Sequence, residues 1–157
     1  MTAETGSRTV AYGRDIEVGR VYRLGEYTLT ADDLVDFAQR WDPQGFHVDE
    51  DIAASSPYGG LIASGVQSFA IMQRLSVLAV YDHWAVIAGK EIRDVAFLRP
   101  VRPGDVLTGT LTVTGVTFDD RDRALVEVDT ELTVEGKPVL RTHSASYLHA
   151  RPPAPAD

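Results

Sequence analysis

The side chains best suited to chemistry lie in one short loop in the first half of the chain. Asp42 and His47 stand five positions apart there, with Pro43 and Gly45 between them. Proline stiffens such a loop and glycine lets it bend, so both side chains can turn toward one point. A carboxylate can take a proton from water, and an imidazole can donate or relay one near neutral pH. The pattern predicts an acid/base pair; the alternative is that Asp42 caps a turn and His47 packs beside Phe46.

A second group of interest opens the most apolar stretch of the chain. Ser64 and Gly65 lie where a long helix is expected to begin. The first turn of a helix leaves backbone N–H groups unpaired at the positive end of the helix dipole, and Gly65 would let a ligand come close to them. Such an amide can stabilise a carbonyl oxygen as it gains charge. The alternative is that Ser64 is an ordinary N-cap and Gly65 only eases helix packing.

The remaining histidines do not suggest a metal site. We expect His83, which follows the apolar stretch, to be a cation at a helix C-terminus or an interface residue. His143 and His149 share one strand face and have no carboxylates at ligand spacing. They are therefore predicted to be packed or surface residues, and no metal ion is expected.

Helices are predicted first along the chain. Residues 21–29 have the pattern of a strand, and Thr30 is a suitable N-cap for a helix that runs to about Trp41. Apolar side chains recur there at intervals of three and four, so one helix face packs inward. Pro43 ends the helix, because the residue before a proline is pushed out of the helical conformation. A further helical turn or two is expected at 49–54.

The apolar stretch itself predicts a central helix. The segment from about Ala63 to Tyr81 is apolar around most of a helix circumference, so other elements must cover it. At 1.5 Å per residue it would be about 28 Å long. Its interrupting polar residues make it unsuitable for crossing a membrane.

Strands fill the second half of the chain. Apolar and polar residues alternate in four segments, at about 92–98, 107–115, 126–134 and 139–149. Short polar segments connect the last three strands, which predicts hairpins and an antiparallel sheet. A single long buried helix laid against one strongly curved antiparallel sheet is an α+β arrangement.

Length and composition fit one folded domain. The chain has 157 residues, a formal net charge of −8 and no cysteine. The negative charge disfavours binding to nucleic acid or anionic membranes, and the missing cysteines exclude disulfides and thiolate chemistry. We expect a polar, flexible leader at 1–17, the folded domain at 18–149 and a flexible proline-rich tail at 150–157. The N-terminus lacks the apolar run of a secretory signal, which predicts a cytoplasmic protein.

The combined pattern resembles the MaoC-like hydratases and dehydratases of the hot-dog fold, a family that includes the (R)-specific enoyl-CoA hydratases. The family signature is an Asp-x-Asn-Pro-aliphatic-His run, followed later by a His-Gly that opens the hot-dog helix. Asp42 stands at its aspartate, His47 at its histidine, and Gly65 at the glycine that opens the helix. The segment 97–105 is similar to the family's strand-turn segment, and the resemblance covers roughly 18–148.

The signature is not matched at every position. Gln44 stands where the family has asparagine, Gly45 where it has proline, Phe46 where it has a small aliphatic residue, and Ser64 where it has the histidine before the glycine. Gln44 keeps an amide on a longer stem, whereas Gly45 makes the loop less stiff than the family's.

The resemblance implies hydration of a trans-2-enoyl thioester to an (R)-3-hydroxyacyl thioester, or the reverse reaction. Asp42 would be the base for attack of water at C3, and His47 would assist delivery of a proton to C2. Gly65, with Ser64 and Gln44, would bind the thioester oxygen and the substrate. No metal or redox cofactor is implied.

The resemblance also implies partners. The substrate would be carried by coenzyme A or by an acyl carrier protein, and Arg93, Arg99 and Arg102 could bind the coenzyme A phosphates. The alternative for these arginines is an exposed strand edge and turn. Hot-dog proteins pair through one continuous sheet, so a homodimer is expected.

Two other functions stay open at this point. A hot-dog acyl-CoA thioesterase would use a carboxylate to hydrolyse the thioester instead of hydrating the double bond. A non-catalytic acyl-binding subunit of a heteromeric dehydratase would not need the acid/base pair that this chain has.

Overall fold

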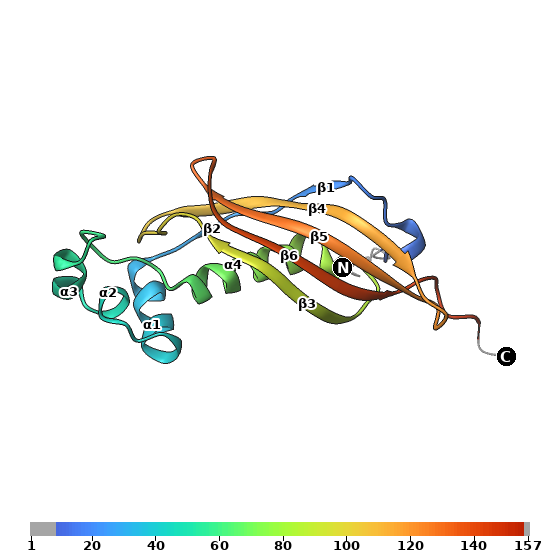
Figure 1. Cartoon of the computed structure of the whole chain (residues 1–157), viewed down its shortest axis with the longest axis horizontal. Coiled ribbons are helices and arrows are strands. Elements are labelled where there is room, and N and C mark those ends of the chain that lie inside the picture. The colour runs from blue at the N-terminus through green and yellow to red at the C-terminus, as the bar shows by residue number, and fades with distance from the viewer. Residues whose placement is uncertain (1–8, 156–157) are drawn as a thin grey trace, which may run out of the picture.

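A computed structural model describes residues 9–155 of the chain (Figure 1). The first eight residues of the predicted flexible leader (1–17) and the last two of the predicted flexible tail (150–157) lie outside the described residues. Within them, a long, curved antiparallel sheet lies along one helix, and three short helices extend beyond one end of the sheet (Figure 1).

Four long strands form most of the sheet. They are β3 (Val86–Phe97), β4 (Val106–Phe118), β5 (Arg123–Val134) and β6 (Lys137–His149). The strand order is β1-β4-β5-β6-β3, and β1 (Val21–Arg23) and β2 (Tyr27–Thr28) both pair with β4. All these pairings are antiparallel, and the β4–β5 and β5–β6 pairs are the hairpins that the sequence predicts. β3 is an edge strand of the sheet. It pairs with β6 on one side and has no strand partner on the other side among the described residues.

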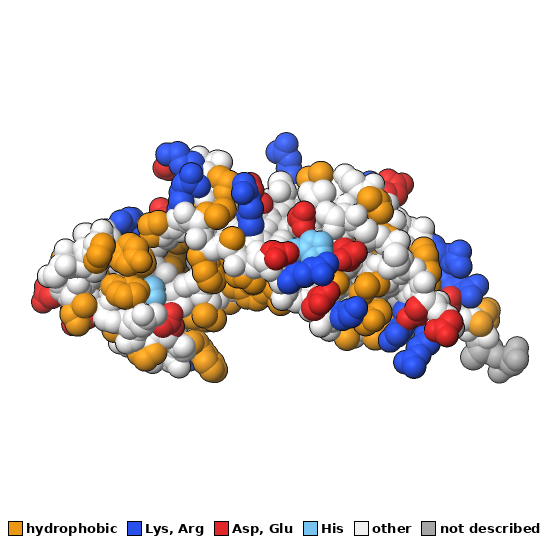
Figure 2. All heavy atoms as spheres, viewed as in Figure 1, with side chains coloured by type: hydrophobic (Ala, Val, Ile, Leu, Met, Phe, Trp, Pro, Cys, Tyr) orange, Lys and Arg blue, Asp and Glu red, His pale blue; other side chains and the backbone are white. Residues whose placement is uncertain are grey.

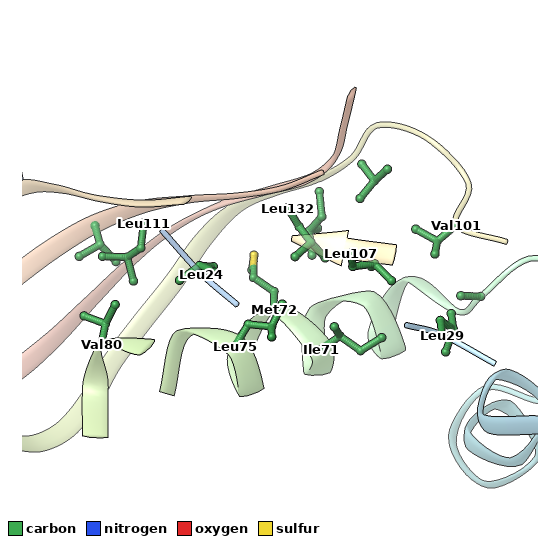
Figure 3. Close-up of a cluster of buried hydrophobic side chains, with 14 of the residues drawn as sticks. Leu24, Leu29, Ile71, Met72, Leu75, Val80, Val101, Leu107, Leu111 and Leu132 are labelled. Carbon is green, nitrogen blue, oxygen red and sulfur yellow. The ribbon is translucent and has the colours of Figure 1, made fainter. Parts of the chain in front are cut away.

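The core lies between the sheet and the central helix. This helix, α4 (Gly65–Ala79), sends Met72 and Leu75 toward the sheet (Figure 3). In β5 the buried residues alternate along the strand, because every second side chain points to the helix. Leu107, Leu111 and Leu132 complete the layer above α4 (Figure 3). The predicted α+β arrangement is therefore confirmed.

Three short helices precede α4. They are α1 (Ala31–Trp41), α2 (Gly45–Val48) and α3 (Glu50–Ser55). Thr30 caps α1 as predicted, because its side chain accepts a hydrogen bond from the Asp33 N–H. These helices lie beyond the end of the sheet, next to the start of α4 (Figure 1).

The structure differs from the predicted elements in several places. The strand expected at 21–29 is two short strands, and the loop expected around Gly45 is the helical turn α2. The central helix is shorter than predicted, beginning at Gly65 and ending at Ala79, and a 3-10 turn at Tyr81–His83 follows it. The edge strand begins at Val86, before the predicted start at 92.

The expectation of a flexible leader up to residue 17 is wrong for its described end. The Ala11 N–H donates to the His83 carbonyl at 2.9 Å. Gly13 is buried against Ala124, with no room for a β-carbon, and Ile16 belongs to the core. Sequence polarity alone did not indicate this packing, because it depends on a glycine contact and a single apolar side chain. No described helix is long and apolar enough to cross a membrane.

Candidate active site

Asp42 and His47 are brought together by the end of α1 and the short helix α2. Asp42 is the C-cap of α1, and its N–H donates to the Ala38 carbonyl at 2.9 Å. His47 lies on α2, whose N-cap is Gln44. The turn between the two helices directs both side chains to one point, where His47 Nε2 lies 3.4 Å from Asp42 Oδ2. The predicted pair is therefore present as a geometric unit.

The orientation of His47 is fixed by a backbone carbonyl. The residue is only 4% exposed, and its Nδ1 lies 2.6 Å from the Ile62 carbonyl oxygen. Because a carbonyl can only accept a hydrogen bond, Nδ1 must carry a proton there. Nε2 is then the nitrogen that faces Asp42. The sequence holds no signal for this contact, since any residue at position 62 supplies the same carbonyl.

Two donors hold the Asp42 carboxylate. Ser64 Oγ donates to Oδ2 at 2.7 Å, and Gln44 Nε2 donates to Oδ1 at 2.9 Å. The hydrogen bond from Ser64, then that from Gln44, lowers the pKa of Asp42 below its ordinary value, against the opposing effect of burial. Asp42 is therefore a carboxylate at neutral pH, and its side chain is still 21% exposed.

Ser64 has two functions in this arrangement. Its Oγ accepts a hydrogen bond from the Val66 N–H at 3.2 Å and so caps α4, as the sequence predicts. The same hydroxyl donates its proton to Asp42. The Asp42–His47 pair and the start of α4 thus form one connected site, and Ser64 joins them.

Gly65 lies in the same hollow, which has a volume of about 440 Å³ and is also lined by Asp42, Gln44 and His47. The Gly65 N–H has no hydrogen-bond partner among the described residues. A β-carbon on Gly65 would lie 2.7 Å from the ring of Phe97. The space that we expected a ligand to use at this glycine is therefore partly taken by Phe97, a residue that the sequence analysis did not identify as part of the site.

Two of the three predicted arginines lie near the hollow. Arg99 lines it and donates to the Pro138 carbonyl at 2.6 Å. Arg102 donates to the carbonyl of Tyr58, another lining residue, at 2.6 Å. Both side chains are exposed and can bring positive charge to the opening of the site.

Arg93 is not part of this group. Its guanidinium lies 2.9 Å from Glu127 and 3.7 Å from Glu91. Figure 2 shows acidic, basic and histidine side chains gathered in one cluster on the face of the molecule that is in view. The two carboxylates already neutralise it, which disfavours an additional phosphate. Arg93 thus lies apart from Arg99 and Arg102 in this chain, and its binding to a coenzyme A phosphate stays a prediction.

His143 belongs to the same charged cluster. Its Nδ1 lies 2.6 Å from Asp129 Oδ1, and its Nε2 lies 3.3 Å from Glu127 Oε1. The hydrogen bond with Asp129 is the main reason that the pKa of His143 is raised. Spacing along the chain does not reveal these carboxylates, because they lie on the neighbouring strand β5, where Asp129 is directly opposite His143.

Neither this cluster nor the other histidines form a metal site. Among residues 9–155, no group of three or more histidine, cysteine, aspartate or glutamate side chains is arranged to hold a metal ion. His83 lies in the 3-10 turn after α4, and His149 is exposed at the end of β6.

The chemistry available at the hollow follows from its donors and acceptors. A carboxylate with its oxygens held by Ser64 and Gln44 faces a nitrogen of a buried imidazole whose opposite nitrogen is fixed. A water molecule or substrate group that reaches both can exchange a proton with either. An unpaired N–H at the start of α4 lies in the same lining and can bind an oxygen that gains charge.

Comparisons with known proteins agree with this description. The family model described as "MaoC like domain" matches residues 15–136. A protein of Bacillus subtilis (strain 168), YdeM, described as uncharacterized, is 36% identical over 93 residues, which are 59% of this chain and 66% of that protein. The (R)-specific enoyl-CoA hydratase of Rhodospirillum rubrum is 29% identical over 141 residues, which are 89% of this chain and 93% of that enzyme.

Solved structures share the architecture. The MaoC-like dehydratase from Rhodospirillum rubrum superimposes with a TM-score of 0.82 at 31% identity, covering 90% of this chain and 99% of that one. This similarity confirms the predicted hot-dog fold, in which the sheet curves around the central helix.

Proposed function

Because the chain belongs to the MaoC-like domain family, we propose that it is a hydro-lyase that reversibly adds water to a trans-2-enoyl thioester, giving an (R)-3-hydroxyacyl thioester. The observation that carries the proposal is the Asp42 carboxylate, held by two donors and facing a buried, oriented His47. The similarity to a curated (R)-specific enoyl-CoA hydratase over most of both chains supports the same reaction class.

The proposed reaction uses the pair to move one proton. A water molecule bound between Asp42 and His47 gives a proton to the pair, with Asp42 as base, while its oxygen attacks C3. The pair returns a proton to C2 through His47 Nε2, since Nδ1 is held by the Ile62 carbonyl. The atoms of one water are thus divided between C3 and C2, and the pair regains its starting state. Proton transfer of this kind contributes roughly 10²–10⁴-fold to a rate.

The start of α4 would stabilise the charge that develops on the thioester oxygen. The Gly65 N–H is unpaired within the described chain and sits at the positive end of the helix dipole. One such donor contributes roughly 10²–10³-fold. Ser64 and Gln44 would position Asp42. This scheme uses proton transfer and hydrogen bonding alone, so we propose that no metal or redox cofactor takes part.

Arg99 and Arg102 would meet the carrier of the acyl group. Guanidinium groups bind phosphates well; Arg99 lines the hollow, and Arg102 contacts Tyr58, which also lines it. The phosphates of coenzyme A or the phosphopantetheine of an acyl carrier protein would supply the negative charge. A negatively charged protein needs such a local positive region to hold an anionic substrate.

We expect a second copy of the chain to pair with β3. This edge strand has 12 residues, nearly all of them exposed, and apolar side chains such as Ile87 and Val95 are among them. A long unpaired edge with exposed apolar residues favours strand pairing with another chain. A homodimer in the cytoplasm is the proposed state, and a subunit of a heteromeric dehydratase is the alternative.

The reaction is tested by mixing purified protein with short and medium trans-2-enoyl-CoA esters. Loss of the conjugated enoyl absorbance without release of free thiol, with (R)-3-hydroxyacyl-CoA as the product on chiral analysis, is the expected result. Release of thiol would instead identify a thioesterase. No reaction with enoyl-CoA or enoyl carrier-protein substrates, together with a monomer by light scattering, would favour the partner-subunit role.

A further inference from the structure

One buried amide in the central helix has no part in the proposed reaction. Gln67 lies on α4, two residues after Gly65, and is only 5% exposed. Its Nε2 donates to the backbone carbonyl of Asp33, on α1, at 3.0 Å. Its Oε1 is the one fully buried side-chain oxygen or nitrogen of the described residues that has no hydrogen-bond partner. The lining of the active-site hollow includes Val66 and Ser68 but not Gln67.

The unpaired oxygen shows that burial by itself does not favour an amide at this position. A buried acceptor without a hydrogen bond is unfavourable, whereas an apolar side chain of similar shape would avoid this cost. Turning the amide over would not help, because Oε1 would then face the Asp33 carbonyl and two acceptors would meet. The bond from Nε2 to that carbonyl is therefore the interaction that the side chain contributes. Local rules of packing are broken mainly where a functional site requires it.

Helix α1 depends on such bonds because few apolar contacts hold it. It lies beyond the end of the sheet (Figure 1), and of its 11 residues only Leu34 and Ala38 are fully buried. At its first turn, the Tyr27 hydroxyl donates to Asp33 Oδ2 at 2.9 Å, which ties the helix to β2. The Gln67 amide ties the same turn to α4. The direction of α1 is thus set largely by polar contacts.

Hydrogen bonds join α1 to α4 near each end of α1. Gln67 binds the Asp33 carbonyl at the start, and Ser64 binds the Asp42 carboxylate where the helix ends. Asp33 and Asp42 are nine positions apart, about 14 Å along a helix axis. Ser64 and Gln67 are only three positions apart, so they lie on one side of the first turn of α4. A helix held at one end can pivot about that point, and a second attachment removes this freedom.

We propose that Gln67 is a positioning residue, which holds α1 at the angle that brings Asp42 to Ser64. It contacts no substrate and acts on the site only through α1. The catalytic importance of the held carboxylate rests on the proposed function, whereas the positioning itself does not. Without the bond from Gln67, α1 pivots and the hydrogen bond between Ser64 and Asp42 weakens.

The variant Gln67→Met tests this inference without any reaction. Methionine is unbranched and flexible like glutamine, but it cannot donate to Asp33 and buries no unpaired oxygen. Gln73→Met is the matched control, because Gln73 is an exposed glutamine of the same helix. The pKa of Asp42 is measured in the full-length protein by carbon NMR titration of its carboxyl group. Loss of the signal in Asp42→Asn identifies it, and thermal unfolding is measured beside the titration.

In Gln67→Met, the pKa of Asp42 is expected to rise toward its ordinary value, because the bond from Ser64 that lowers it is weakened. The thermal midpoint should stay near that of the wild type, since removal of the unpaired oxygen offsets the loss of one hydrogen bond. Gln73→Met should change neither quantity. In Ser64→Ala, where the bond is already absent, adding Gln67→Met should cause no further rise of the Asp42 pKa.

An unchanged Asp42 pKa in Gln67→Met would overturn the inference. So would a large fall in the thermal midpoint, which would make Gln67 a structural residue. A further rise in the Ser64→Ala/Gln67→Met double variant would also overturn it, because Gln67 would then not act through the Ser64 bond.

Enoyl-CoA hydration gives a second measurement of the same effect. In Gln67→Met, kcat should fall roughly ten- to hundredfold with little change in KM, because the base is displaced while the substrate contacts remain. An unchanged kcat would overturn the inference. If the wild type hydrates no enoyl-CoA, the proposed function fails, but the NMR titration can still be read, so the two proposals fail separately.

Discussion

Ser64 Oγ donates a hydrogen bond of 2.7 Å to Asp42 Oδ2, across 22 positions of the sequence. The bond ties the first turn of the central helix to the loop that carries the proposed base. It is also the largest single cause of the lowered Asp42 pKa. A group with a lowered pKa in the folded protein adds stability above its unfolded pKa, and that stability is lost as the pH falls through the folded pKa.

Removing the Ser64 hydroxyl should change both activity and stability. In Ser64→Ala, the pKa of Asp42 rises toward its ordinary value, so the acid limb of the kcat/KM pH profile moves to higher pH. Loss of the N-cap should also lower the free energy of unfolding by about 1 kcal/mol. Ser64→Thr keeps a hydroxyl and should keep the wild-type acid limb. An unshifted acid limb in Ser64→Ala would show that the bond does not set the ionisation of the base.

Removing the Gln44 amide should also raise the pKa of Asp42, but by less than removing the Ser64 hydroxyl. The amide is the second cause of the lowered Asp42 pKa, after Ser64. In Gln44→Ala, the acid limb of the kcat/KM profile should move to higher pH by less than in Ser64→Ala, and α4 should keep its stability because its cap is intact. A larger shift in Gln44→Ala than in Ser64→Ala would reverse the order of the two donors. Denaturant unfolding and the pH profile measure the two effects.

The contact of Gly65 with Phe97 predicts a variant that is stable but altered in function. A β-carbon at position 65 would meet the far end of the Phe97 ring, and Phe97 is 60% exposed and free to turn aside. Gly65→Ala should therefore unfold within about 1 kcal/mol of the wild type, since alanine also favours a helix. Activity should fall, because the displaced ring and the new methyl group occupy the hollow.

The double variant Gly65→Ala/Phe97→Ala separates these two causes. If the displaced ring is responsible, removing it should restore part of kcat/KM relative to Gly65→Ala. If the methyl group blocks the oxygen-binding amide, the double variant should stay as inactive as Gly65→Ala. Wild-type activity in Gly65→Ala itself would contradict the placement of the thioester oxygen at this amide.

His143 should make the stability of the protein depend on pH. Asp129 and Glu127 raise the pKa of His143, while Arg93 opposes them. A raised pKa adds stability that is fully present below the unfolded pKa and is lost as the pH rises through the folded pKa. His143→Gln should therefore lower the free energy of unfolding more at pH 5.5 than at pH 8.5. Equal losses at both pH values would show that the imidazole charge contributes nothing to stability.

The sequence carried the main features of the fold because they follow from periodic patterns. Alternating residues predicted the long strands, and a helix apolar on most sides predicted the buried α4. The short helix α2 escaped prediction, because four residues with Gly45 at their start give no periodic signal. The buried contacts of Gly13 and Ile16 escaped for a similar reason, since the segment around them is polar.

The candidate site was predictable as a set of residues but not as a network. Asp42, His47, Gln44, Ser64 and Gly65 do line or adjoin one hollow. The connections between them could not be read from spacing. The Ile62 carbonyl that orients His47 belongs to the backbone, and the bond from Ser64 to Asp42 joins elements whose relative positions only the fold defines. The charged partners of His143 could have been found from hairpin register, which places Asp129 opposite it.

The most direct test of the account replaces Asp42 by asparagine and measures kcat/KM for trans-2-enoyl-CoA hydration. His47→Gln is measured beside it. The control is Asp36→Asn, which removes the same negative charge at an exposed position of α1. Both site variants should lose roughly 10²–10⁴-fold in kcat/KM while thermal unfolding shows that they are still folded, and the control should keep the activity and stability of the wild type. Hydration that persists in folded Asp42→Asn at the wild-type rate would contradict the central claim that Asp42 is the base.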